Sequence, residues 1–406
     1  MEWKKVPISS ICEGIYEGPH ATPPSCESGA YYLGIPALTS DGQIDFSKVP
    51  RICEKDFKKW TKRVTPKYGD IVFTNEATLN LYARIPKDFY GCLGRRLGLV
   101  RPLQDKVDVD YLFYYFFSPY WRKVIALKKV SGSTVERILM KKFPHFPVLL
   151  PPLNIQNKIA SILSDYDNLI ENNNKRIRLL EQMAENLYKE WFVRFRFPGH
   201  EKAEFENGLP KGWKIEKIGN VSETIGGGTP STENPAYWDG DIKWVTPSDI
   251  TSKNSLPLLK VEGRISEEGL KKSSAKLLPP YTILMTSRAS IGYFGIAPFE
   301  VCTNQGFISI IPQKENLRMF MLYMLKSRKD EIIANANGAT FLEISKGRFR
   351  KMNMVVPIDS VLDSFENKAR TIFEEIMKIE QQNQILSRQR DLLLPRLMSG
   401  KLEVKV

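Results

Sequence analysis

The most restrictive feature of this sequence is an internal repeat. SGSTVERILMKKFPHFPVLLP at 131–151 aligns without a gap on NGATFLEISKGRFRKMNMVVP at 337–357, so that Phe143 corresponds to Phe349, 206 residues later. Because self-similarity at a fixed spacing marks a repeated structural unit, we expect two copies of one domain.

Weaker matches precede this segment in the same order in both halves. TPPSCESGAYY from Thr22 resembles TPSTENPAYW from Thr229, GDIVFTNEATLN from Gly69 resembles TILMTSRASIG from Thr282, and CLGRRLGLVRP from Cys92 matches CTNQGFISIIP from Cys302 in length and in its final proline. The repeat therefore extends over most of each half.

Each repeated unit is followed by a heptad pattern. Positions 159, 163, 166, 170, 173, 177, 180, 184, 187 and 191 form one seam of mostly apolar residues, and the positions 206 residues later form a second in the same phase. Alternating spacings of four and three predict long helices that pack against each other. The tails end near Gly199 and Gly400, as helix ends often do.

Each seam contains one asparagine, Asn173 in the first and Asn383 in the second. If the helices are antiparallel and partner numbers sum to 556, every seam position meets a seam position and the two asparagines face each other. A matched buried asparagine pair is well suited to fix helix register. The alternative is that both amides face solvent at a frayed seam.

These patterns predict an α/β (α+β) chain of four parts: a globular domain at 1–155, a helical spacer at 156–204, a second globular domain at 205–357 and a second helical spacer at 358–406. Antiparallel pairing of the two long helices would relate the similar domains by a pseudo-twofold axis, the symmetry of the duplex DNA backbone.

The net charge of +13 is confined to the two predicted domains. Residues 1–155 carry 23 Lys+Arg against 15 Asp+Glu, and residues 205–357 carry 20 against 15, whereas both spacers are neutral. Two separate basic regions favour two contacts with a polyanion such as double-stranded DNA.

The five cysteines and the hydropathy pattern indicate the compartment. Cys12, Cys26, Cys53, Cys92 and Cys302 contain no CxxC pair, and we expect all five to be reduced thiols. There is no apolar run long enough to span a membrane and no signal peptide at the start of the sequence, so we expect a cytoplasmic protein.

The sequence contains no recognisable catalytic or metal motif. The glycines at 226–228 are followed by Thr229-Pro230, which fits neither a P-loop nor a dinucleotide-binding turn. An NPPY-type methylation motif and a nuclease core are absent, and the three histidines lack metal-ligand spacing. We therefore expect no catalysis, no metal and no cofactor bound by this chain.

Loops rich in hydroxyls, amides and arginines within the basic domains are the candidates for DNA contact, because such groups bind phosphates and base edges. In the first domain the candidates are Thr22, Thr74, Asn75, Glu76, Thr78, Asn80, Arg95 and Arg96; in the second they are Gly228, Thr229, Thr286, Ser287, Arg288, Ser290 and Gly292. Glu76 and Arg288 occupy corresponding places, which suggests that the domains read different bases. The alternative for each residue is an ordinary surface turn.

Three stretches together resemble the specificity subunit of type I restriction–modification systems. LPKGWKIEKIGNVSETIGGGTPSTENPAYWDGDIKWVTPSDI resembles the opening of a target recognition domain, and the segments at 150–192 and 386–402 resemble the central and closing conserved spacers. The first domain keeps Thr22-Pro23 but lacks the glycine triplet and the PSD tripeptide, which leaves its recognition loops undefined.

The resemblance implies two target recognition domains, each reading one half of a split, asymmetric DNA site, with the helices setting the gap. It also implies two methyltransferase subunits and two restriction subunits as partners, with S-adenosylmethionine, ATP and Mg²⁺ bound by those partners. In this view the glycine triplet at 226–228 serves mainly as a scaffold.

Apolar residues off the seam are candidates for methyltransferase docking, namely Tyr188, Phe192, Phe195, Leu392 and Leu394. Packing against the chain's own domains is the alternative. A stand-alone DNA-binding adaptor or regulator is the second functional hypothesis, and a self-contained nuclease or methylase is a third, which the missing motifs disfavour.

Overall fold

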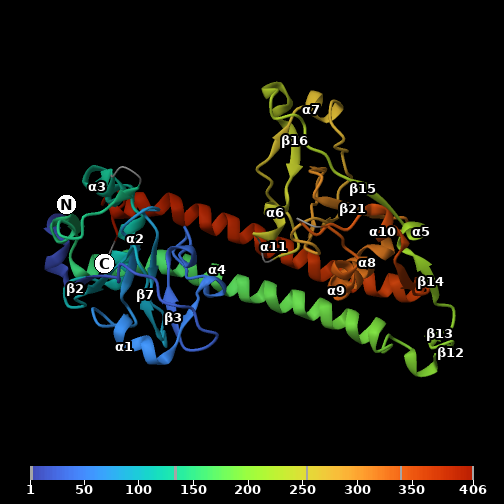
Figure 1. Ribbon diagram of the computed structural model, residues 1–406, viewed down its shortest axis with the longest axis horizontal. Helices are drawn as coiled ribbons and strands as arrows, with labels where there is room; N and C mark the ends of the chain where they lie inside the picture. Colours follow the sequence, from blue (N-terminus) through green and yellow to red (C-terminus); the bar gives the residue numbers. More distant parts are fainter. Residues whose placement is uncertain (1–2, 132–134, 253–254, 339–340, 405–406) are drawn as a thin grey trace. The chain divides into compact units, whose positions relative to one another are not determined.

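The computed structural model describes residues 3–131, 135–252, 255–338 and 341–404 (Figure 1). Thr134 and Thr340, which the repeat alignment pairs, lie outside these residues. The chain forms two compact units, Met1–Ile170 with Leu386–Val406, and Glu171–Ile385. The boundaries between these units fall within both long helices, whereas the sequence prediction treats the helices as separate parts.

The main sheets of the first unit are a four-stranded antiparallel sheet, a three-stranded sheet and a two-stranded sheet. The four-stranded order is β2 (Cys12–Glu17), β8 (Leu97–Pro102), β5 (Ile71–Thr74) and β6 (Tyr82–Arg84); the three-stranded order is β4 (Arg51–Ile52), β3 (Ala30–Leu33) and β7 (Gly91–Leu93); and β1 (Lys4–Pro7) pairs with β11 (Pro147–Leu150). β3 and β7 are parallel, and the other pairs are antiparallel.

The second unit repeats this topology strand for strand. Its four-stranded order is β15 (Ser222–Gly226), β21 (Phe307–Pro312), β18 (Ile283–Thr286) and β19 (Phe294–Ile296); its three-stranded order is β17 (Arg264–Ile265), β16 (Trp238–Val245) and β20 (Cys302–Thr303); and β14 (Lys214–Lys217) pairs with β22 (Asn353–Val356). The parallel pair again lies in the three-stranded sheet, between β16 and β20. The predicted repeat is thus confirmed in the order and direction of the strands.

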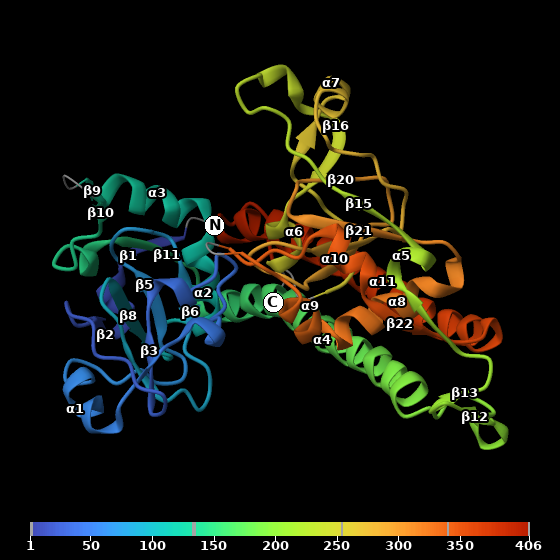
Figure 2. The same ribbon diagram turned by 45° about the vertical axis from the view of Figure 1, so that its right-hand side comes forward.

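Short helices complete each unit. The first contains α1 (Phe57–Trp60), α2 (Val109–Phe117) and α3 (Pro119–Lys128); the second contains α5 (Ile218–Val221), α6 (Pro247–Thr251), α7 (Glu267–Lys271), α8 (Arg318–Ser327), α9 (Lys329–Ala334) and α10 (Lys346–Lys351). The two-residue strands are β9 (Val130–Ser131), β10 (Glu136–Arg137), β12 (Phe205–Glu206) and β13 (Leu209–Pro210). In both views of the second unit, β16 and α7 lie at one end, α8 and α9 at the other, and β15 and β21 between them (Figures 1 and 2).

One helix in each unit is buried on nearly every side. In α2 the residues from Tyr111 to Phe116 are buried, and in α8 so are those from Met319 to Leu325. A helix that is apolar all round belongs in a core, so α2 and α8 anchor the two cores. Phe143 and Phe349, which the repeat alignment pairs, are both fully buried in these cores.

Two long helices, α4 (Leu153–Tyr188) and α11 (Asp359–Met398), contribute one segment each to both units. None of the twenty predicted seam positions is exposed. In the second unit the segments run antiparallel, because Asn173 pairs with Asn383 while Arg176, further along α4, pairs with the earlier Glu375. In the first unit Arg390 donates to Asp167 at 2.6 Å.

The cysteine prediction is wrong in one respect. Cys26 and Cys53 form a disulfide, and the three other thiols are buried. Their proximity arises from a backbone bridge, in which the Cys26 N–H donates to the Arg51 carbonyl at 2.8 Å. This long-range pairing brings together two residues 27 apart, and their spacing in the sequence gives no sign of it.

Candidate nucleic-acid interface

The loops that follow β5 and β18 have the same conformation. The first reads TNEATLNL at 74–81 and the second TSRASIGY at 286–293. Ala77 and Ala289 both adopt positive φ, 67° and 58°, and so do the residues three positions later, Asn80 at 67° and Gly292 at 78°. Positive φ is uncommon outside glycine, so its recurrence at two matched positions shows one loop design used twice.

A buried threonine closes each loop. The Thr74 hydroxyl accepts the Leu81 N–H at 3.2 Å, and the Thr286 hydroxyl accepts the Tyr293 N–H at 3.0 Å. Both threonines are at most 1% exposed. They were predicted to contact DNA, but burial assigns them to shaping the loop.

A second segment of the chain pairs with each loop through the same backbone hydrogen bonds. In the first unit the Ala77 N–H donates to the Glu136 carbonyl and the Ile138 N–H to the Asn75 carbonyl, which sets Glu76 opposite Arg137. In the second unit the Ala289 N–H donates to Leu342 and the Ile344 N–H to Ser287, which sets Arg288 opposite Glu343. These are non-hydrogen-bonded antiparallel pairs, the type in which opposed side chains lie closest together.

The central residues of the two loops carry opposite charges. Arg288 Nε lies 3.9 Å from Glu343 Oε2, and both side chains are about half exposed. In the first unit Glu76 Oε1 lies 3.3 Å from Arg96 Nε. Gly306 occupies the place of Arg96 in the second unit, since the Ser287 N–H donates to Gly306 as the Asn75 N–H donates to Arg96.

The predicted candidates therefore divide by accessibility. Ser287 and Asn75 are buried, and the Asn75 amide donates to Glu17 Oε1 at 3.1 Å. The exposed or half-exposed candidates are Thr22, Glu76, Thr78, Asn80, Arg95 and Arg96 in the first unit and Thr229, Arg288 and Ser290 in the second. These side chains, and not the buried ones, are accessible to a ligand.

Sequence reasoning missed Arg137 and Glu343. Both residues lie within the aligned segments at 131–151 and 337–357 and correspond to each other, 206 positions apart. A reversal of charge at that aligned position was visible in the sequence. Its meaning required the pairing with Glu76 and Arg288, which only the fold supplies.

Helix α10 adds positive charge next to the second loop. It begins two residues after Ile344 and contains Lys346, Arg348, Arg350 and Lys351, all of them exposed. Arginine and lysine side chains of this kind neutralise phosphates and position a protein on a duplex.

The glycine triplet is a packing element. A Cβ on Gly227 would lie 1.9 Å from the Asn304 carbonyl oxygen, and one on Gly228 would lie 2.3 Å from Ser274 Oγ. The Gly228 N–H donates to Thr303 and its carbonyl accepts from Trp244 Nε1, both at 2.9 Å. Gly228 was predicted to contact DNA, but both of its backbone groups are used inside the unit.

The nearby PSD tripeptide is also structural. Asp249 forms a capping box with Thr246 at the start of α6, accepting from both the Thr246 N–H and its hydroxyl at 2.8 Å. A capping box satisfies amides that a helix leaves unpaired at its first turn. The Asp249 carboxylate is therefore engaged in holding α6 in place.

Most of the predicted docking residues are buried. Tyr188 and Phe192 belong to the core of the second unit, Phe195 packs against it, and Leu394 belongs to the core of the first. Only Leu392 is strongly exposed, at 62%. The other four side chains pack within the chain's own units.

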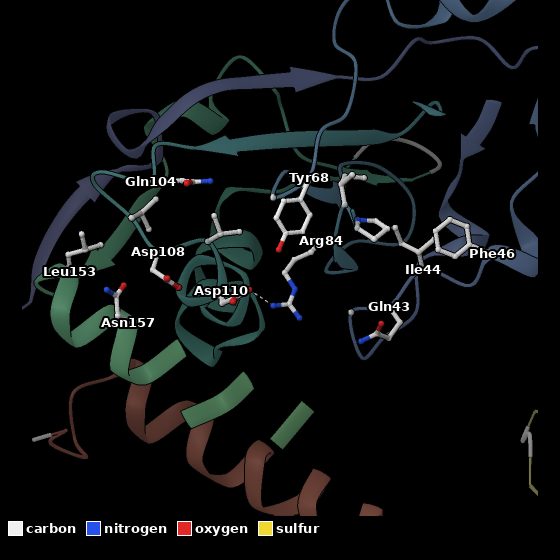
Figure 3. Close-up of a pocket in the computed structure, with 16 residues that line it drawn as sticks. Gln43, Ile44, Phe46, Tyr68, Arg84, Gln104, Asp108, Asp110, Leu153 and Asn157 are labelled. Carbon is white, nitrogen blue, oxygen red and sulfur yellow. Dashed lines mark hydrogen bonds and ion pairs between the residues drawn. The ribbon is translucent and has the colours of Figure 1, made fainter. Parts of the chain in front are cut away.

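A cavity of about 680 Å³ lies in the first unit, beside the start of α2 (Figure 3). Arg84 pairs with Asp110 across it and stacks over Phe113 at 4.4 Å. Asp108 accepts the Tyr111 N–H at 2.7 Å, and burial raises the pKa of its carboxyl group. Its charged groups are thus held in one ion pair and a helix cap, and the described lining has no histidine, cysteine or serine.

Among the described residues, no group of three or more histidine, cysteine, aspartate or glutamate side chains is placed to hold a metal ion. Within the same residues, none of the helices has the length and apolarity that crossing a membrane requires.

Comparison with known proteins identifies similar chains. The family model described as "Type I restriction modification DNA specificity domain" matches residues 1–182 and 210–388. The type I restriction enzyme MjaIX specificity subunit of Methanocaldococcus jannaschii is 32% identical over 200 residues, which cover 49% of this chain and 46% of that protein. The alignment thus spans about half of each. The putative MjaX specificity subunit of the same organism is 25% identical over 100% of this chain and 94% of its own.

A solved structure shares the fold. The type I restriction–modification system S subunit from M. genitalium aligns with a TM-score of 0.56 at 14% identity, covering 97% of this chain and 96% of that one.

Proposed function

The chain belongs to the family of type I restriction modification DNA specificity domains, and from this premise we propose that it is a non-catalytic subunit with two readers. Each unit contacts one half of a bipartite, asymmetric sequence in double-stranded DNA. The long helices set the unread gap between the halves.

The observation that supports this division of labour is the duplicated loop with different side chains. Both units hold the same backbone hydrogen bonds around Glu76 and Arg288, so each presents its side chains to a ligand from the same scaffold. The charges on the two scaffolds are reversed. Two equal scaffolds with unlike chemistry suit a target whose two halves have unlike sequences.

The reaction itself is assigned to partners. We propose that two methyltransferase subunits bind S-adenosylmethionine and that two restriction subunits use ATP and Mg²⁺. The absence of the corresponding motifs from the sequence supports this assignment.

Exposed apolar side chains on the helices are candidates for methyltransferase docking. In the second unit Leu179 and Met183 lie one turn apart on α4 and are 64% and 58% exposed, and in the first unit Leu392 is 62% exposed. Apolar side chains at i and i+4 on one helix face form a continuous contact surface.

Mapping of methylated adenines in the source genome tests the proposal. We expect a two-part motif whose modified bases lie on opposite strands, roughly one helical turn apart, by the spacing rule for twofold DNA binders. Replacing residues 1–155 with the first domain of another specificity subunit should change one half of the motif. A change in both halves would contradict the division of labour.

Two further measurements separate the remaining hypotheses. Co-purification with a methyltransferase is expected, and its failure would favour a stand-alone DNA-binding adaptor. The pure chain, given DNA, S-adenosylmethionine, ATP and Mg²⁺, should neither methylate nor cleave. Either activity would show a catalytic centre in this chain.

A further inference from the structure

Each unit presents one arginine and one glutamate side by side at the same place in its fold, in opposite order. In the first unit the loop supplies Glu76 and the facing strand supplies Arg137; in the second the loop supplies Arg288 and the facing segment supplies Glu343. At both of these equivalent positions, the charge in the second unit is thus the opposite of the charge in the first.

The side chains of each pair point to the same side of the backbone. Directly opposed residues of a non-hydrogen-bonded antiparallel pair have Cβ atoms about 4.5–5.5 Å apart and share one face. The Arg288 and Glu343 side chains are 48% and 47% exposed, and Arg137 is exposed as well. The shared face is therefore open to solvent.

The pair in the second unit is weakly held in the free protein. The contact between Arg288 and Glu343 is loose at 3.9 Å, and across the described residues neither side chain has another hydrogen-bond or ion-pair partner. An exposed ion pair contributes little to stability. Both side chains can therefore leave this ion pair and bind a ligand at a small cost in free energy.

The two chemistries match the two edges of one base pair. An arginine donates two hydrogen bonds to guanine O6 and N7, and a glutamate accepts from the N4 amino group of cytosine. Guanine and cytosine of one pair present these groups next to each other in the major groove. An adjacent arginine and glutamate are thus complementary to a single G·C pair in one orientation.

We propose that each unit reads one G·C base pair of its own half-site through an arginine and a glutamate, Glu76 with Arg137 in the first unit and Arg288 with Glu343 in the second. Because the charges are reversed, the two units read their G·C base pairs in opposite orientations relative to their own folds. The proposal rests on the proposed function and adds Arg137 and Glu343 as specificity-determining residues. The loop residue faces cytosine in the first unit and guanine in the second.

The second unit is easier to test, because only two charged residues face each other there. In the first unit Arg96 adds a third charge beside Glu76, and Gly306 occupies the corresponding place in the second unit. The measurement is competition binding of the full chain, co-purified with its methyltransferase, to duplexes in which each position of the second half-site is varied. For the Arg288→Ala variant we expect discrimination at one G·C position to fall about tenfold, with the first half-site unchanged. The R288E/E343R variant should prefer the inverted base pair, C·G, at that position.

The matched control is K211E/E204K, which reverses an exposed ion pair of 2.6 Å in the same unit, beside the β12–β13 turn. It should leave every position of the motif unchanged. Glu343→Gln keeps side-chain length and removes the charge, and Arg288→Gln leaves a shorter neutral polar side chain. Both provide folded alternatives if the double reversal unfolds, and each should weaken discrimination at the same G·C pair.

The possible outcomes separate the failure of the base-pair proposal from the failure of the proposed function. If the wild type shows a bipartite motif but the Arg288 variants alter no position, or alter an A·T pair, the proposal is overturned and the proposed function stands. If the wild type shows no bipartite preference at all, the proposed function fails and the pairing proposal fails with it.

Discussion

Asn173 Nδ2 donates a hydrogen bond to Asn383 Oδ1 at 2.9 Å, and Asn383 Nδ2 donates in turn to Asn174 Oδ1 at 2.9 Å. Asn173 and Asn383 are both 7% exposed within a seam of largely apolar residues. A shift of one heptad in one direction would place Asn173 against Ile376 and Asn383 against Tyr166, and a shift in the other direction would place Asn383 against Leu180. A buried polar group without a partner is costly. The pair therefore favours one register of the helices.

Replacing Asn383 with leucine should destabilise the second unit by about 1–3 kcal/mol, because Asn173 is left buried without its partner. The N173L/N383L double variant should lose less than the sum of the single losses, since two leucines satisfy each other. Urea unfolding of all four proteins in a double-mutant cycle measures this coupling. Asn172→Leu, at an exposed neighbouring position, is the control, and additive losses would argue against a matched pair.

The two loops predict a second, local effect. Thr286→Val removes the hydroxyl that accepts the Tyr293 N–H. Because Thr286 is buried, the free energy of unfolding should fall by about 1–3 kcal/mol. DNA affinity should fall as well, because the loop that carries Arg288 loses its fixed shape. Urea unfolding and DNA binding of the variant measure both effects.

Ser290→Ala, in the same loop but exposed, is the matched control, and its stability should change by less than about 0.5 kcal/mol. Equal effects of the two substitutions would mean that the Thr286 hydroxyl does not shape the loop.

The features that the sequence predicted are those set by spacing. The duplication of one domain and the facing asparagines follow from the 206-residue offset and the heptad phase, which need no knowledge of the packing. Burial was harder to predict. Thr74 and Thr286 are hydroxyl residues like those that contact DNA, yet each is the buried last residue of a strand. Arg137 gains its meaning only from a backbone pairing with Glu76 across some sixty residues.

The disulfide gives a prediction for the first unit. Cys26 and Cys53 are separated by 27 residues, and closing a loop of that size is worth about 3–4 kcal/mol in the chain-entropy account. The C26S/C53S variant should unfold at correspondingly lower denaturant concentration. Titration of thiols in denaturant should find three free groups without reductant and five with it.

The Cys12→Ser variant, which leaves the disulfide intact, is the control for the loss of a thiol. Five reactive thiols in protein purified without reductant would show that the two cysteines are unpaired.

Glu366 predicts a pH dependence in the second unit. Its side chain is 5% exposed, and it accepts the Met319 N–H at 2.9 Å and Arg370 Nη2 at 3.2 Å. Burial raises the pKa of the Glu366 carboxyl above its ordinary 4.5, more than these two donors lower it. A carboxyl group with a raised pKa in the folded state stabilises the fold when protonated. That contribution is complete below pH 4.5 and is lost as the pH rises through the folded-state value.

Glu366→Gln removes this titration while an amide oxygen can still accept the Met319 N–H. The free energy of unfolding of the variant relative to wild type should therefore increase as the pH rises from about 4 to about 8, because only the wild type must bury a charge. Urea unfolding at several pH values measures the difference. Glu374→Gln, at an exposed position on the same helix, controls for the change in net charge. A difference that stays constant over this range would show that Glu366 ionises as easily in the fold as in the unfolded chain.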